Sequence, residues 1–150
     1  RVMASRPEET LALAYLGDLE LRQNRYQRAE AYYRQALESA RTTGDRISEP
    51  GALSGLGEVF IATGRLGEAI DQLTTALDLG TQMHDKYEQA RAHCGLGRAH
   101  DAGGDDGKAR HHRQEALTLY TSLGVPEADQ VRTSLAQGDC GSTGLPARSR

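Results

Sequence analysis

The sequence predicts an all-α protein in which pairs of helices stack into a right-handed solenoid. The first observation is an internal repeat, because the pattern of residues 16–37 returns forty residues later and again forty residues after that. The second is the apolar spacing of three and four residues within each copy, which indicates one buried face of a helix. The third is the set of apolar residues available for a core, which is rich in Ala and Leu and includes one Phe and no Trp. We therefore expect three 40-residue helix pairs and no sheet.

Six sequence columns hold the same residue type in all three copies. They are Ala12, Ala52 and Ala92; Leu16, Leu56 and Leu96; Gly17, Gly57 and Gly97; Ala29, Ala69 and Ala109; Ala36, Ala76 and Ala116; and Leu37, Leu77 and Leu117. A fixed period of this length marks a solenoid, in which each unit buries its apolar face against its neighbours.

Turn residues set the expected element boundaries. The helices are predicted at residues 7–23, 26–43, 47–63, 66–83, 86–102 and 106–123, so that the repeats span about 7–44, 47–84 and 87–124. Asn24, Gly64 and Gly104 occupy one column, as expected where a helix ends in the left-handed region. After Pro126, residues 126–136 should form a capping helix that closes a domain of residues 7–137.

Both ends of the chain lie outside this pattern. Residues 1–6 and 138–150 have little to bury, and we expect them to be disordered. The chain begins with Arg1, which suggests a piece of a longer protein.

Composition disfavours several classes of function. The formal charge is −3, from 18 basic and 21 acidic side chains mixed along the whole length, so we expect no direct binding of nucleic acid. The longest apolar run, residues 11–16, is far short of the roughly 20 residues that a membrane span needs. Cys94 and Cys140 have no framework spacing, and we interpret them as free thiols in a reducing compartment, the cytoplasm.

No catalytic or metal-binding motif stands out. His111 and His112 are adjacent and point about 100 degrees apart on a helix, while His93 and His100 are two turns apart, so no pair has zinc spacing. No Ser, Cys or Lys nucleophile has a recognisable base partner. The sequence therefore predicts a protein that is not an enzyme, with no catalytic residue, no metal and no cofactor.

The repeat resembles the tetratricopeptide repeat. The resemblance rests on Leu16-Gly17, on Ala29 twelve residues after Gly17, and on Ala36 seven after that. The usual repeat of that family has about 34 residues, and 40 approaches the length of HEAT and armadillo repeats. The spacing of the small residues favours the tetratricopeptide interpretation. Its structural signature here is Leu16, Gly17, Ala29, Ala36, Leu56, Gly57, Ala69, Ala76, Leu96, Gly97, Ala109 and Ala116.

The resemblance also implies a binding surface. In tetratricopeptide proteins the first helix of each pair lines a concave groove, which takes a partner protein or peptide. The corresponding groove residues here are Leu11, Asp18, Leu21, Ser54, Glu58, Ile61, Arg91, Arg98 and Asp101, with Ala14 and Cys94 in the same columns. We expect Glu58 and Arg98 to face solvent.

The end of the repeat region resembles a narrower group. Residues 108–136, KARHHRQEALTLYTSLGVPEADQVRTSLA, are similar to the end of the C-terminal tetratricopeptide region of actinobacterial antibiotic regulatory proteins. Those are transcription activators with a winged-helix DNA-binding domain elsewhere. That family tends to have an aromatic residue where this chain has Arg113. The resemblance implies a partner-binding or signal-sensing module of a cytoplasmic bacterial transcription regulator.

Two other classes of function remain open. One is a stand-alone adaptor that assembles other proteins, and the other is a small-ligand sensor, which would need a closed apolar pocket.

Two side-chain expectations complete the reading. Arg113 falls on a buried stripe, so its stem should pack while its head reaches water or an acid. The face of Leu11, Tyr15 and Leu19 on the first helix lacks a preceding unit, so we expect a weak homodimer through this helix.

Overall fold

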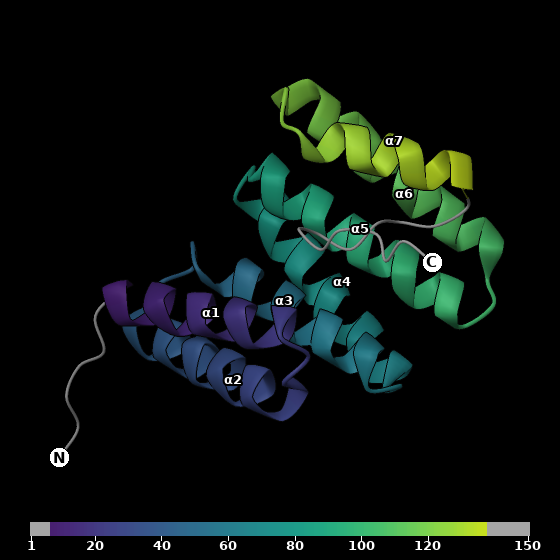
Figure 1. Cartoon of the computed structure of the whole chain (residues 1–150). Helices are drawn as coiled ribbons and strands as arrows, with labels where there is room; N and C mark the ends of the chain where they lie inside the picture. The colour runs from purple at the N-terminus through teal and green to yellow at the C-terminus, as the bar shows by residue number, and fades with distance from the viewer. Residues whose placement is uncertain (1–6, 138–150) are drawn as a thin grey trace, which may run out of the picture.

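The computed structural model describes residues 7–137, which form seven helices (Figure 1). These are α1 (Pro7–Arg22), α2 (Tyr26–Thr43), α3 (Glu49–Ala62), α4 (Leu66–Gln82), α5 (Lys86–Ala102), α6 (Asp106–Leu123) and α7 (Glu127–Gln137). No strand occurs within this range. The expected disorder of residues 1–6 and 138–150 concerns segments outside it.

The helices stack in chain order as antiparallel pairs, with α1 and α2 at one end and α6 and α7 at the other (Figure 1). The turns within the three pairs contain Asn24, Gly64 and Gly104, all with positive φ, as the sequence predicts. The third helix starts two residues later than expected, because the Asp45 carboxylate accepts hydrogen bonds from the backbone N–H groups of Ile47 and Ser48 in a preceding turn. The fold is an all-α solenoid.

The recurring spacing of glycines along the repeats has a steric cause. A Cβ added to Gly17 would lie 2.7 Å from the Tyr33 ring, and one added to Gly55 would overlap the same ring. One repeat further on, Cβ atoms added to Gly57 and Gly95 would each lie 2.6 Å from Leu73. Tyr33 and Leu73 each therefore pack between a glycine of their own helix pair and a glycine of the next pair.

The third repeat places an arginine where the earlier ones place Tyr33 and Leu73. Arg113 is 4% exposed, its stem packs against Gly97, and its Nη2 atom lies 3.1 Å from Oδ2 of Asp101. The head therefore reaches an acid whose own side chain is 36% exposed, which confirms the expectation for this residue.

The two ends of the stack differ in character. At the far end α7 covers Tyr120 through Ala128 and Val131, and it presents exposed polar residues outwards. At the near end Leu16 and Leu19 are 40% and 48% exposed, although the residues in the same columns of the next two repeats are at most 3% exposed. Tyr15, 63% exposed, stands in the column that holds Gly55 and Gly95.

The prediction that Cys94 is a free thiol is wrong, because Cys94 is disulfide-bonded. The same prediction for Cys140 lies outside the described residues. Since disulfides persist in oxidising surroundings, the cysteines no longer argue for a reducing compartment.

None of the helices in residues 7–137 has the combination of length and hydropathy that a membrane span requires.

Candidate functional site

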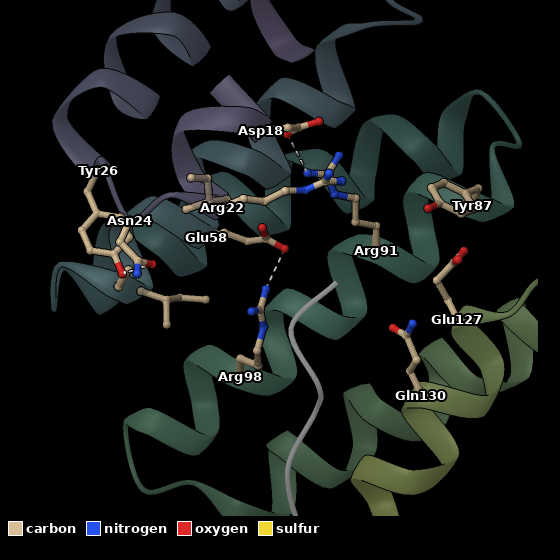
Figure 2. Close-up of a pocket in the computed structure, with 13 residues that line it drawn as sticks. Asp18, Arg22, Asn24, Tyr26, Glu58, Tyr87, Arg91, Arg98, Glu127 and Gln130 are labelled. Atoms are coloured by element: carbon tan, nitrogen blue, oxygen red, sulfur yellow. Dashed lines mark hydrogen bonds and ion pairs between the residues drawn. The ribbon is translucent and has the colours of Figure 1, made fainter. Parts of the chain in front are cut away.

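The first helices of the pairs, α7, and the turn that leads into α2 line a pocket that we call the central pocket (Figure 2). Its volume is about 400 Å³. Its lining residues are Asp18, Leu21, Arg22, Asn24, Tyr26, Glu58, Ile61, Ala62, Tyr87, Arg91, Arg98, Glu127 and Gln130. The wall combines apolar residues with charged groups from α1, α3, α5 and α7.

Two of these charged groups form a tight pair. Arg98 Nη2 donates a hydrogen bond to Oε1 of Glu58 over 2.6 Å, and Figure 2 shows the arginine reaching from α5 to the carboxylate of α3. Their side chains are only 17% and 9% exposed. The prediction that both face solvent is wrong, because adjacent first helices bring the same column of successive repeats together.

Asp18 joins the first helix pair to the third. The Tyr33 hydroxyl donates to Oδ1 of Asp18 over 2.5 Å, and Nη2 of Arg91 lies 3.7 Å from the same oxygen. Burial of the Tyr33 phenol, and then the negative charge of Asp18, raise the pKa of Tyr33 well above its ordinary value. Tyr33 therefore remains a neutral donor that fixes the Asp18 carboxylate.

Arg91 is a half-buried cation of the site. Burial alone would lower its pKa, but the carboxylates of Glu58, Glu88 and Asp18 outweigh burial and raise the pKa above the ordinary arginine value. Its side chain is 16% exposed. The guanidinium is therefore attracted by three acids and has little charge left to offer a ligand.

A second pocket adjoins the first and shares Asp18, Tyr87 and Arg91 with it. Its volume is about 410 Å³. Its remaining lining residues are Leu11, Ala14, Tyr15, Ile47, Ser48, Gly51 and Glu88. We call it the Glu88 pocket.

Two family models match the chain, and both describe the tetratricopeptide repeat. One covers residues 48–122 and the other residues 1–46. The chain belongs to the tetratricopeptide repeat family. No curated protein matches it in a sequence search.

Membership of the tetratricopeptide repeat family indicates protein–protein interaction as the general role. The narrower resemblance to actinobacterial regulators has no counterpart among these matches.

The tetratricopeptide fold distributes the predicted groove residues unevenly. Six line the central pocket, namely Asp18, Leu21, Glu58, Ile61, Arg91 and Arg98. Leu11 lines the Glu88 pocket instead. Ser54 is 1% exposed, and Asp101 points to Arg113 on α6, so neither lines a pocket.

Sequence reasoning missed the residues that α7 contributes. Glu127 and Gln130 complete the central pocket opposite α1, yet the repeat register was not extended to them. Glu127 stands forty residues after Tyr87 and eighty after Ile47, so it belongs to a column of pocket-lining residues. Treating the capping helix as the first helix of a fourth tetratricopeptide unit would have found Glu127, but not Gln130, whose column holds the buried residues Thr10, Pro50 and Ala90.

The histidines meet across two helices of the third tetratricopeptide pair. Nδ1 of His93 on α5 and Nδ1 of His112 on α6 are 2.9 Å apart, and the His100 ring stacks on His112 with 5.5 Å between centroids. Sequence spacing considered only pairs within one helix and missed this contact. Within the described residues, no group of three or more His, Cys, Asp or Glu side chains is arranged to hold a metal ion.

Proposed function

We propose that this chain is a partner-binding or signal-sensing module of a bacterial transcription regulator, and that its partner segment binds in the central pocket. The observation that carries the proposal is the pocket itself, which five separate helices line with both apolar and charged groups. A volume of about 400 Å³ suits a few side chains of a partner and is at the lower end for small-ligand sites.

The surface chemistry supports a protein partner. Two arginines of the pocket are already engaged with acids, so the site offers no free row of cations for a phosphate backbone. We therefore propose no direct binding of nucleic acid and none of membranes by this chain. The charged wall also disfavours the sensor of an apolar small ligand.

The regulator context rests on the resemblance of residues 108–136 to the closing region of actinobacterial regulatory proteins. In the structure this segment makes α6, the turn at Gly124 and α7. A cytoplasmic location belongs to the same proposal, since a transcription regulator works where the DNA is.

The alternative is a stand-alone adaptor unrelated to transcription. The upstream coding region separates the two: a winged-helix domain in the same reading frame fits only the regulator. An upstream frame that encodes no DNA-binding domain would leave the adaptor.

The central pocket is tested at its rim, where substitutions leave the ion pairs Arg98–Glu58 and Arg91–Asp18 intact. Arg22 and Gln130 are exposed residues on opposite walls. We expect Arg22→Glu with Gln130→Glu to abolish capture of partners from native cell extract, as measured by quantitative mass spectrometry of affinity-purified material.

A matched control makes the same charge changes elsewhere. Arg110→Glu with Gln114→Glu alters exposed residues of α6 that line neither pocket. This control should capture partners as the wild type does, and both doubles should keep the wild-type circular dichroism. Equal recovery by the rim double and the wild type would move the interaction away from the central pocket.

A further inference from the structure

The Glu88 pocket contains a carboxylate that the other residues of the described range 7–137 do not satisfy. Oε2 of Glu88 is buried and has no hydrogen-bond partner among the described residues. No ion pair joins Glu88 to a cation in this part of the chain, whereas Asp18 and Glu58 each pair with an arginine. A buried, unpaired carboxylate oxygen costs free energy, and a ligand with a hydrogen-bond donor could recover that cost.

The local charge count favours a cation as that ligand. Asp18, Glu58 and Glu88 carry three negative charges, and Arg91 and Arg98 carry two positive ones, which leaves one negative charge in excess. Arg98 is engaged by Glu58, and Arg91 pairs with Asp18. Burial raises the pKa of Glu88, and the other nearby acids add to this while Arg91 opposes it. An anionic ligand would meet two cations that are already neutralised.

The walls of the pocket suit the stem of a long side chain. Tyr15 and Tyr87 are 63% and 40% exposed, and Leu11 and Ile47 are 47% and 75% exposed. Aromatic faces attract ammonium and guanidinium groups, and aliphatic walls cover a methylene stem. Exposed apolar side chains around an unpaired carboxylate therefore match one class of group, a cation on an aliphatic stem.

We propose that the Glu88 pocket binds a lysine or arginine side chain of the partner segment, with the cation on Glu88 and its stem against Tyr15 and Tyr87. This proposal rests on the proposed function and names the anchor residue of the partner. The central pocket, which shares Asp18, Tyr87 and Arg91 with the Glu88 pocket, receives the neighbouring residues of the same segment.

The test uses three capped amino acids as probes: Nα-acetyl-lysine N-methylamide, its arginine counterpart, and its norleucine counterpart, which keeps the stem without the charge. Each is titrated into the protein, and the tyrosine ring signals and the Glu88 carboxyl carbon are followed by NMR. We expect saturable shifts from the two cationic probes and none from norleucine.

Variants locate the site. Glu88→Gln should weaken binding of the cationic probes roughly tenfold, the loss expected for a hydrogen bond to a charged group. Tyr15→Ala, at an exposed position, should weaken it about two- to fivefold through loss of the aromatic contact. Glu38→Gln, an exposed change on α2 that also removes one negative charge, should leave binding unchanged.

Three outcomes would overturn the proposal: no saturable shift, equal binding of norleucine, or an unchanged affinity in Glu88→Gln. If partner capture is lost in the rim double while the probes fail, the central pocket stands as the partner site and only the basic anchor falls. If the probes bind as expected while the rim double still captures partners, the anchor stands and the central pocket falls.

Discussion

Glu58 and Arg98 occupy the same column of successive repeats, forty residues apart, and their side chains pair across 2.6 Å. The same column in the first repeat holds Asp18, a second acid. The first two repeats therefore carry like charges in this column, and Arg91 from the third repeat offsets both. The change of sign along this column makes the groove a connected set of charges, so its residues cannot be altered independently.

Substitutions of Glu58 and Arg98 should lower the free energy of unfolding by unequal amounts. Glu58→Gln should lower the free energy of unfolding by about 1–3 kcal/mol, because it leaves the charge of Arg98 without its acid. Arg98→Gln should cost less, because Glu58 retains Arg91 nearby. Urea denaturation of both singles and the double gives their coupling energy. The exposed pair Asp129–Arg132 is the control and should show coupling near zero. Additive effects at Glu58 and Arg98 would contradict the prediction.

Arg113→Leu should leave stability unchanged or raise it. The substitution restores the residue type of Leu73 and removes a buried guanidinium whose Nε and Nη2 atoms lack hydrogen-bond partners despite the close acid. Asp101→Asn should instead cost about 1–3 kcal/mol, since it leaves that charge unpaired. Thermal and urea unfolding measure both, with Arg110→Leu on the exposed face of α6 as control. A loss above roughly 2 kcal/mol in Arg113→Leu would show a broken network.

Gly55→Ala and Gly67→Ala should change stability in opposite directions. A methyl group at Gly55 would overlap the Tyr33 ring, which is fully buried and held by Asp18. At Gly67, within α4, the methyl group would meet nothing within 4 Å, so the gain is about 0.5–1 kcal/mol from helix propensity. Chemical denaturation of the two variants measures the difference. Equal effects would mean that Tyr33 can move aside.

Acidification should destabilise the contact between α5 and α6. Burial first, and then His93, His100, His111 and Lys108, lower the pKa of His112 to about 4, and burial also lowers the pKa of His93 despite Glu115. The unfolded chain, with a histidine pKa of about 6.5, then binds more protons than the folded protein. The contribution of His112 to the free energy of unfolding is therefore fully present above about pH 6.5. It falls by up to about 1.4 kcal/mol for each pH unit below that.

Urea unfolding between pH 7 and pH 5 measures this slope. His112→Gln should flatten it, because the variant has no proton to take up at that position. His84→Asn is the control, since His84 is exposed at a left-handed position that asparagine tolerates, and its slope should equal the wild-type one. An unchanged slope in His112→Gln would assign the acid sensitivity to other groups.

The protein should self-associate weakly through α1. Leu16 and Leu19 lie on the face that is buried in the two later repeats, and sedimentation equilibrium should show a mass that rises with concentration. Leu16→Lys should abolish this rise. Leu123→Lys, at a position of almost equal exposure at the end of α6, should not. A strict monomer at millimolar concentration, or equal effects of the two variants, would exclude the α1 face.

The repeat made the fold predictable from the sequence. The site was less predictable, because the sequence does not show which way each side chain points. Six invariant columns fixed the register, and with turn residues they placed the helix ends within about two residues. The same register named Asp18, Glu58 and Arg98 as groove residues. It could not show that Ser54 turns inwards or that Asp101 reaches Arg113, because those choices depend on packing between helices.

Spacing along the sequence could not predict contacts between side chains on different helices. His93 and His112 meet because α5 and α6 lie antiparallel, so residues nineteen apart become neighbours. Glu88 gave no signal in the sequence, since its importance comes from an oxygen that has no hydrogen-bond partner among residues 7–137.

The two ends of the stack together determine how far copies of this molecule could assemble. Tyr15 fills the place where later repeats keep a glycine to admit a bulky neighbour, so no unit with such a residue can add to α1 in register. The outer face of α7 is polar and offers no matching surface. Head-to-tail growth would need one end to receive the other, and the described surfaces of α1 and α7 do not match in this way. If two α1 faces pair as predicted, that contact uses both faces and closes, so the protein should then resist polymerisation into filaments even when it is concentrated.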